Sequence, residues 1–192
     1  ASDVYKRQVL MQAGSGRVVG DINGETPMYP ASMTKIMTTI VAIENLSDLN
    51  QEITVTNDMI ANLYAQDATQ AGFQPGETVQ AIDLLYGVML PSGADCCIAL
   101  ADTIAGSEEG FVELMNQKAE KLGLENTHFC NTTGLHADDH YSTAKDIAEL
   151  LRYALKNSTF REIIESPYHS TPGTNVHLSL IHISEPTRPI SI

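Results

Sequence analysis

A serine and a lysine stand three residues apart near the start of the chain, at Ser32 and Lys35. A serine hydroxyl is a poor nucleophile until a base takes its proton, and a lysine amine can serve as that base once burial disfavours its charged form. Residues three apart share one face of a helix. The spacing therefore suits nucleophilic catalysis. It is not specific, because Ser142 and Lys145 share it, and there we expect Ser142 to cap a helix.

The residues after Lys35 predict the helix that this chemistry needs. Pro30 suits the start of that helix, because its missing N–H would have no partner there. A helix N-terminus also carries a partial positive charge and free N–H groups, which stabilise an anionic intermediate. We expect the helix to end near Asn45. The apolar residues recur at steps of three and four, the period of a buried helix face, at Ile36, Met37, Ile40, Val41 and Ile43.

A second serine lies at a break between two helical segments. Ser92 belongs to the sequence Pro-Ser-Gly at 91–93, which separates a helix beginning near Thr78 from one spanning residues 94–105. A serine at such a break is held on a short loop between two packed helices. The alternative is that Ser92 is the N-cap of the second helix, and one serine can do both.

The remaining pattern is mostly helical, with a few short strands towards the N-terminus. We expect a hairpin around residues 14–16, a strand at 53–55 and a loop over 65–76. This predicts an α/β architecture with a helical lobe against an antiparallel sheet. The sheet is incomplete, because one hairpin cannot bury a face by itself. Further helices are expected at residues 107–122, 142–155 and 160–165.

Length and composition predict one acidic globular domain. The chain has 192 residues, 43% of them hydrophobic, and a formal net charge of −13, which argues against binding nucleic acid or an anionic membrane face. No apolar run is long enough to cross a bilayer.

Three cysteines, with Cys96 and Cys97 adjacent, make a poor disulfide framework. Cys130 lies near three histidines whose spacing matches no standard zinc pattern, so we assign no metal site. These histidines are His128, His136 and His140.

Both ends of the chain are predicted to be foreign to the protein. The DNA sequence GATGTGTATAAGAGACAG can encode residues 3–8, and its reverse complement, CTGTCTCTTATACACATC, can encode residues 178–183. One short DNA read on opposite strands thus accounts for both tails, and it resembles the transposon end used in sequencing libraries. We expect residues 1–8 and 178–192 to be adapter-derived tails. Residues 9–177 would then be part of a catalytic domain that continues in both directions in the natural protein. The alternative is a genuine terminal strand.

Three separated segments resemble one family, the serine-type D-alanyl-D-alanine carboxypeptidases, which are the low-molecular-mass penicillin-binding proteins. Residues 30–35 read Pro-Ala-Ser-Met-Thr-Lys, and residues 84–93 read Leu-Leu-Tyr-Gly-Val-Met-Leu-Pro-Ser-Gly. Residues 127–136 read Thr-His-Phe-Cys-Asn-Thr-Thr-Gly-Leu-His, and His-Tyr-Ser-Thr-Ala follows at 140–144. The resemblance runs from about Val9 to His177, with the motifs in the family's order. It implies the transpeptidase fold shared by penicillin-binding proteins and β-lactamases.

The resemblance also implies a reaction. It is hydrolysis of the terminal D-Ala–D-Ala bond of peptidoglycan stem peptides through an acyl-enzyme. Ser32 would be the nucleophile, Lys35 its base, and Ser92 the relay of protons to the leaving amine. Gly93 and Ala94, in the second motif, would bind substrate. The resemblance further implies that β-lactam antibiotics bind covalently to the enzyme and that the reaction needs no cofactor. It also implies a location outside the cytoplasmic membrane, with any membrane contact made through segments missing from this chain.

The chain departs from the family pattern at two motifs. The second motif normally reads Ser-x-Asn, whereas Ala94 stands at its third position and cannot make the hydrogen bonds of an asparagine. The third motif, Lys-Thr-Gly or a close variant on an edge strand, does not occur in the 192 residues. That strand would bind the substrate carboxylate and supply an oxyanion donor. We therefore expect the chain as printed to lack useful activity, although its parent gene encodes an enzyme.

Two other functions compete with this interpretation. A class A β-lactamase shares the fold class and the Ser-x-x-Lys motif, but it needs a glutamate that drives water onto the acyl-serine and a Ser-Asp-Asn second motif, and neither is evident here. A penicillin-binding fold that only senses or scaffolds cell-wall peptides is the non-enzymatic alternative, and Ala94 is the residue that favours it.

Overall fold

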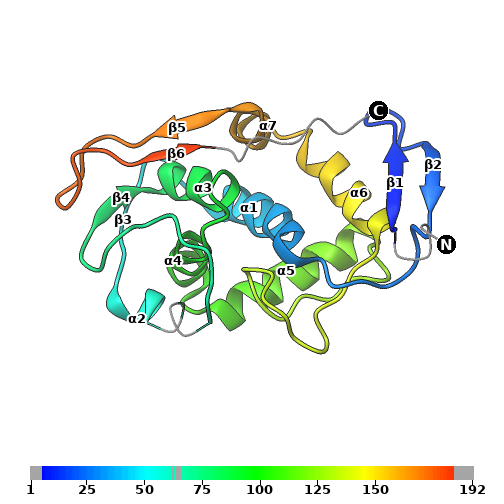
Figure 1. The fold of residues 1–192 in the computed structure, drawn as a ribbon, viewed down its shortest axis with the longest axis horizontal. Coiled ribbons are helices and arrows are strands. Elements are labelled where there is room, and N and C mark those ends of the chain that lie inside the picture. The colour runs from blue at the N-terminus through cyan, green and yellow to red at the C-terminus, as the bar shows by residue number, and fades with distance from the viewer. Residues whose placement is uncertain (1–5, 62, 64–65, 184–192) are drawn as a thin grey trace.

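The computed structural model describes residues 6–61, 63 and 66–183 (Figure 1). Helices predominate over strands in this part of the chain, as the sequence predicts. The helical elements are η1 (Ala31–Met33, a 3-10 turn), α1 (Thr34–Asn45), α2 (Asn57–Ile60), α3 (Ala81–Met89), α4 (Ala94–Ala105), α5 (Glu108–Leu122), α6 (Ala144–Ala154) and α7 (Ser158–Glu165). The strands are β1 (Gln8–Met11), β2 (Val18–Ile22), β3 (Glu52–Thr54), β4 (Thr78–Gln80), β5 (Tyr168–Ser170) and β6 (Ile181–Ile183).

Helix α1 runs through the middle of the molecule, and α3, α4, α5, α6 and α7 all contact it (Figure 1). Its apolar residues Met37, Ile40 and Val41 are buried, and so are Thr38 and Thr39. A helix that is buried nearly all round belongs to the core, and each fully buried large apolar side chain contributes about 1.5–3 kcal/mol. The helix predicted after Lys35 is therefore confirmed, and it forms the rigid centre on which the first motif is mounted.

The predicted N-terminal hairpin is also present. Strands β1 and β2 pair antiparallel, with Gln8 opposite Ile22 and a register shift between Leu10 and Met11. Helix α6 contacts β1, while Leu10 is 64% exposed. The described strands form three separate two-stranded sheets, so within that part of the chain β1 and β2 gain no third strand.

The expected helix start near Thr78 is wrong. Residues Thr78–Gln80 form strand β4, which pairs with β3 so that Thr78 lies opposite Thr54 and Val79 opposite Ile53. The two threonine hydroxyls are 2.9 Å apart. Cross-strand partners of this kind favour an extended backbone, and the partner strand lies more than twenty residues earlier in the chain. Local periodicity could not reveal it, and the helix begins instead at Ala81.

The prediction that Ser142 caps a helix is wrong by one residue. The N-cap of α6 is Thr143, whose side chain accepts a hydrogen bond from the backbone N–H of Asp146 (3.1 Å). Ser142 is fully buried, and its backbone exchanges two hydrogen bonds with Met28. Because this bridge keeps Ser142 extended, the next residue becomes the cap.

Strand β6 lies in the segment that the DNA argument assigns to a foreign tail. It pairs antiparallel with β5, with Ile181 opposite Ser170. His182 is buried, its Nε2 lies 3.2 Å from the carbonyl oxygen of Ala71, and its ring packs edge-on against Phe73. The β5–β6 hairpin runs alongside α3 (Figure 1).

Candidate active site

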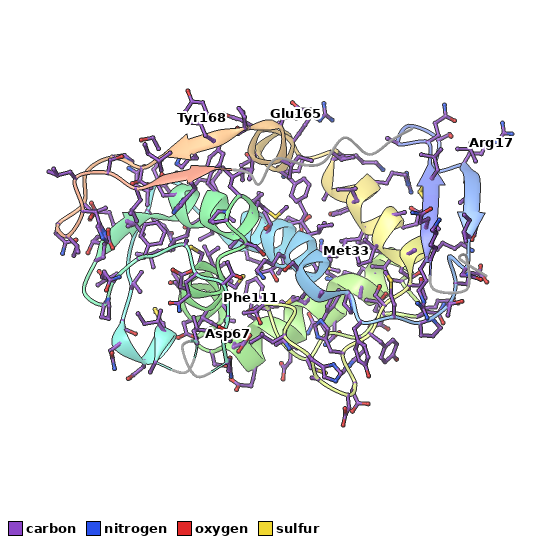
Figure 2. All side chains as sticks on the ribbon, viewed as in Figure 1. Arg17, Met33, Asp67, Phe111, Glu165 and Tyr168 are labelled. Atoms are coloured by element: carbon purple, nitrogen blue, oxygen red, sulfur yellow. The ribbon has the colours of Figure 1, made fainter. Side chains whose placement is uncertain are left out.

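Ser32 lies in the 3-10 turn η1, immediately before α1. Met33, its neighbour, is labelled in Figure 2 at the N-terminal end of that helix. Ala31, on the other side, has a positive φ of 49°, a conformation that costs a non-glycine residue energy. The backbone therefore turns sharply just before the serine. As a result the serine hydroxyl is exposed at the positive end of a buried helix.

Lys35 is the second residue of α1, and only 5% of it is exposed. Its Nζ donates a hydrogen bond to the carbonyl oxygen of Thr133 (2.5 Å). Thr133 belongs to a loop nearly a hundred residues further along the chain. The predicted burial of this amine is therefore present, and a distant carbonyl fixes where the amine points.

Ser92 meets Ser32 directly. Its Oγ donates a hydrogen bond to the Oγ of Ser32, at 3.1 Å. Ser92 has a positive φ of 62°, so the second serine, like Ala31 beside the first, has a strained backbone. The N-cap of α4 is Gly93, which makes the alternative role of Ser92 as that cap wrong. Strained backbones of this kind cluster at functional sites, where the surrounding structure holds them.

The two serines and the lysine line one cavity of about 140 Å3. Four segments of the chain form its walls: the start of α1, the break before α4, and two loops at 67–69 and 133–135. The predicted substrate-binding residue Ala94 also lines it, whereas Gly93, the other predicted substrate-binding residue, does not. The full lining is Ala31, Ser32, Lys35, Asp67, Ala68, Thr69, Ser92, Ala94, Thr133, Gly134 and Leu135.

Gly134 is a residue of this site that the sequence argument did not single out. Its φ is +84°, and a Cβ atom built on it would lie 2.0 Å from the carbonyl oxygen of Ala31 and 3.1 Å from the backbone nitrogen of Ser32. Only glycine allows this close approach. The sequence Asn-Thr-Thr-Gly at 131–134 is typical of a turn, but nothing in it shows that the turn packs on the backbone of Ser32.

The loop that carries Thr133 and Gly134 is held from several sides. The side chain of Glu108, in the first turn of α5, accepts hydrogen bonds from the backbone N–H of Thr132 (2.8 Å) and from its hydroxyl (2.7 Å). The carbonyl oxygen of Thr132 accepts from the hydroxyl of Thr38 in α1 (2.7 Å). The carbonyl group that binds Lys35 therefore belongs to a firmly anchored turn.

The histidines considered as metal ligands are engaged in other contacts. His140 is buried, its Nδ1 accepts a hydrogen bond from the backbone N–H of Cys130 (3.0 Å), and its Nε2 lies 2.8 Å from the hydroxyl of Thr34. Burial lowers the pKa of His140 to about 4. His128 Nδ1 contacts a backbone carbonyl oxygen, and His136 packs on a tyrosine ring. Among the described residues no three His, Cys, Asp or Glu side chains are grouped as metal ligands.

Most of the chain matches one known protein family. The model of the D-alanyl-D-alanine carboxypeptidase family, Peptidase_S11, matches residues 4–177. The chain belongs to this family. Its members include DacF of Bacillus subtilis, 39% identical over 152 residues, which are 77% of this chain and 39% of that protein. DacC of Escherichia coli is 43% identical over 148 residues, which are 74% of this chain and 37% of that protein.

Solved structures show that the predicted fold is correct. The DD-transpeptidase of Streptomyces K15 superposes with a TM-score of 0.83 at 32% identity, covering 90% of this chain and 69% of that one. Penicillin-binding protein 6B of Escherichia coli superposes with a TM-score of 0.84 at 31% identity, covering 93% of this chain and 57% of that one. The chain spans less than two fifths of the length of DacF and DacC. Its fold is thus the transpeptidase fold, in which helices accompany short antiparallel sheets.

Proposed function

We propose that the natural protein is a serine-type carboxypeptidase that removes the terminal D-Ala of peptidoglycan stem peptides. The observation that carries the proposal is the contact of 3.1 Å between the hydroxyls of Ser32 and Ser92, in a cavity that also contains the buried amine of Lys35. Two hydroxyls and an amine in one small cavity suit acyl transfer to serine. Membership of the family supports the same reaction.

The reaction proceeds in two steps. The amine of Lys35 takes the proton of Ser32, whose Oγ attacks the carbonyl carbon of the penultimate D-Ala. The backbone N–H of Ser32, at the start of α1, stabilises the oxyanion. Ser92 delivers its proton to the leaving amine as the C–N bond breaks and takes up in its place the proton that Lys35 removed from Ser32, and free D-Ala departs. Water then hydrolyses the acyl-serine ester, which releases the shortened peptide and restores the serine.

Ala94 leaves part of the substrate cleft without a polar side chain. It is buried and lines the cavity, and its backbone N–H donates to the carbonyl oxygen of Thr69 (2.8 Å). An asparagine amide at this position would offer hydrogen bonds that a methyl group does not. We propose that substrate is held here by backbone groups, and that β-lactams acylate Ser32 because they mimic the same dipeptide.

The test is acylation of Ser32 by a fluorescent penicillin, with Ser32→Ala as the blank. We expect the protein made from the contiguous natural gene to be labelled and the 192-residue chain to be labelled poorly, because the latter contains no Lys-Thr-Gly motif. Strong labelling of the 192-residue chain would contradict the second expectation. Absence of labelling in the natural protein would contradict the proposed function.

A non-catalytic cell-wall peptide sensor is the second candidate, and Ala94 is the observation in its favour. The two functions differ in how they depend on the catalytic groups. Ser32→Ala and Lys35→Ala should abolish release of D-Ala from a D-Ala–D-Ala peptide if the protein is an enzyme. A sensor would release none even as wild type, and it would bind the peptide equally well in both variants.

We also propose that residues 1–8 and 178–192 derive from adapter DNA and that residues 9–177 belong to the natural protein. One DNA sequence, read on opposite strands, can encode residues 3–8 and 178–183, which supports this proposal. The family match ends at residue 177, although it begins at residue 4. Sequencing the natural gene across the codons for 177 and 178 tests the proposal, because a continuation that reads Leu-Ser-Leu-Ile-His-Ile would contradict it.

The family's role in the cell wall supports a location outside the cytoplasmic membrane, and we propose that location for the natural protein. Within the described residues no helix is both long enough and apolar enough to span a bilayer. Cell fractionation followed by penicillin labelling of intact cells tests the location, because labelling that requires cell lysis would contradict it.

A further inference from the structure

The buried carboxylate of Asp95 has no part in the steps described above. Asp95 lies in the first turn of α4, three residues after Ser92, and is only 1% exposed. A charged carboxylate is almost never this deeply buried unless partners satisfy it. Its partners therefore indicate what it does.

Asp95 accepts hydrogen bonds from two backbone groups of one loop. Its Oδ1 accepts a hydrogen bond from the N–H of Ala71 (2.8 Å), and its Oδ2 accepts from the N–H of Gly72 (3.0 Å). Gly72 has a φ of +103°, which an L side chain rarely adopts. Two successive N–H groups bind one carboxylate, each through its own oxygen, and charge-assisted bonds of this kind are stronger than neutral ones.

The same loop forms part of the active-site cavity. Residues 67–69 line the cavity, and the carbonyl oxygen of Thr69 accepts from the N–H of Ala94. Asp67, labelled in Figure 2, lies on the same loop. Residues 69–72 are thus tied by three hydrogen bonds to Ala94, the last residue of the second motif, and to Asp95, which follows it.

The packing between Asp95 and Ser92 leaves no free space. A Cβ atom on Gly93 would lie 2.7 Å from the Oδ1 of Asp95 and 2.8 Å from both the Cβ of Ala71 and the carbonyl oxygen of Gly87. Ser92 holds its left-handed conformation next to this contact. Such strain persists only where the surroundings enforce it, and the tight packing at Gly93 is part of those surroundings.

We propose that Asp95 is a positioning residue for acyl transfer: by holding residues 69–72 against α4, it keeps the hydroxyl of Ser92 on Ser32 and in line with the leaving group. The inference rests on the proposed function. A displacement of about 1 Å in a positioned group lowers a rate roughly 100-fold, so a loss of this carboxylate should slow the step that Ser92 serves.

The first experiment measures amide hydrogen exchange in the 192-residue chain and needs no activity. In wild type we expect the amides of Ala71 and Gly72 to be protected. In Asp95→Asn one acceptor becomes an NH2 group that faces a peptide N–H, so the protection should fall at least roughly 10-fold. Asp102→Asn, on the same helix, is the matched control and should change neither amide. Unchanged protection in Asp95→Asn would overturn the proposal.

The second experiment separates positioning from general damage to the fold. In the natural protein, Asp95→Asn should slow acylation by a D-Ala–D-Ala peptide roughly 10- to 100-fold, because the leaving amine needs the proton from Ser92. Acylation by a matching thioester should change far less, because a thiolate leaves without that proton. Equal slowing of both substrates would show a merely structural role and overturn the proposal, and so would no slowing of either.

Two further outcomes are distinguishable. If Asp95→Asn does not fold, Asp95→Ser, which keeps one acceptor and adds no NH2 group, is carried through the same two measurements. If wild-type natural protein is acylated by neither substrate, the proposed function is wrong and the catalytic part of this inference is overturned with it. The exchange measurement still decides whether Asp95 holds the loop.

Discussion

The chain contains the Ser-x-x-Lys spacing twice, and the two copies occupy the same place relative to a helix. Ser32 lies two residues before the first residue of α1 and Ser142 two residues before the first residue of α6, so that Lys35 and Lys145 are each the second helical residue. Their surroundings differ. Ser32 faces a cavity and a second serine, whereas Ser142 is fully buried against the hydroxyl of Thr127 (2.8 Å).

The lysines differ even more than the serines. Lys35 is 5% exposed and bonds to a backbone carbonyl group, whereas the side chain of Lys145 is 45% exposed and pairs with Glu25 at 2.5 Å. The carboxylate of Glu25 accepts a hydrogen bond from Lys145 and raises the pKa of that amine, which stays charged. The same spacing therefore has different surroundings in the two places, and these surroundings fit the nucleophile that we propose at Ser32 and a structural role for Ser142.

Removing each lysine in turn should give the largest contrast. In the natural protein Lys35→Ala should lower the rate of acylation by a fluorescent penicillin roughly 100- to 10000-fold, since a general base is lost. Lys145→Ala, the matched control, should leave the rate unchanged. Stopped-flow labelling measures both rates. Similar rates for the two variants would contradict the assignment of the base.

Gly134→Ala should disrupt the site around Ser32 and Lys35 without changing the side chain of either residue. The added methyl group meets the carbonyl oxygen of Ala31 at 2.0 Å. We expect a loss of roughly 2–4 kcal/mol in the free energy of unfolding, together with loss of acylation. Urea unfolding measures the first and penicillin labelling the second.

Gly123→Ala is the control for Gly134→Ala, because Gly123 also has a positive φ, of 70°, but has nothing within 4 Å of the added carbon. It should cost only about 1 kcal/mol, the strain of the backbone alone. Equal losses in the two variants would show that the contact with Ala31 is not what matters.

His140 connects the two copies and should make stability depend on pH. It contacts Thr34, between Ser32 and Lys35, and it precedes Ser142 by two residues. Its pKa is about 4 in the folded protein and near 6.5 when unfolded, so the unfolded state binds the proton first. The contribution of His140 to the free energy of unfolding is complete above pH 6.5 and is lost as pH falls towards 4, and it amounts to at most about 3 kcal/mol.

Urea unfolding between pH 7 and pH 4 measures this contribution, and His140→Gln should flatten the dependence of stability on pH. An equally steep loss in the variant would contradict the role of His140.

Thr143→Ala should have the smallest effect and should be confined to the second copy. It removes the cap of α6, which costs about 1 kcal/mol of stability. Acylation of Ser32 should not change. Thermal unfolding and penicillin labelling check the two expectations, and a slower acylation would show that the copies are coupled through α6.

Much of the fold was predictable because it depends on neighbours in the sequence. The helix after Lys35, the hairpin of β1 and β2, and helix α5 between the Ser107 cap and Gly123 all follow from local periodicity, caps and turns. Strand β4 and the cap at Thr143 were missed because distant pairing decides them: β4 pairs with β3, and Ser142 pairs with Met28.

The sequence by itself determined that one serine and one lysine share a helical face and that a second serine lies at a break between helices, because these facts follow from spacing along one chain. Only the tertiary structure decided how differently the two identical spacings are surrounded. That difference depends on the burial of Lys35, on the carbonyl group of Thr133 and on the missing side chain of Gly134. Packing brings Thr133 and Gly134 to Lys35 and Ser32 from a distant part of the chain, which no local pattern can show.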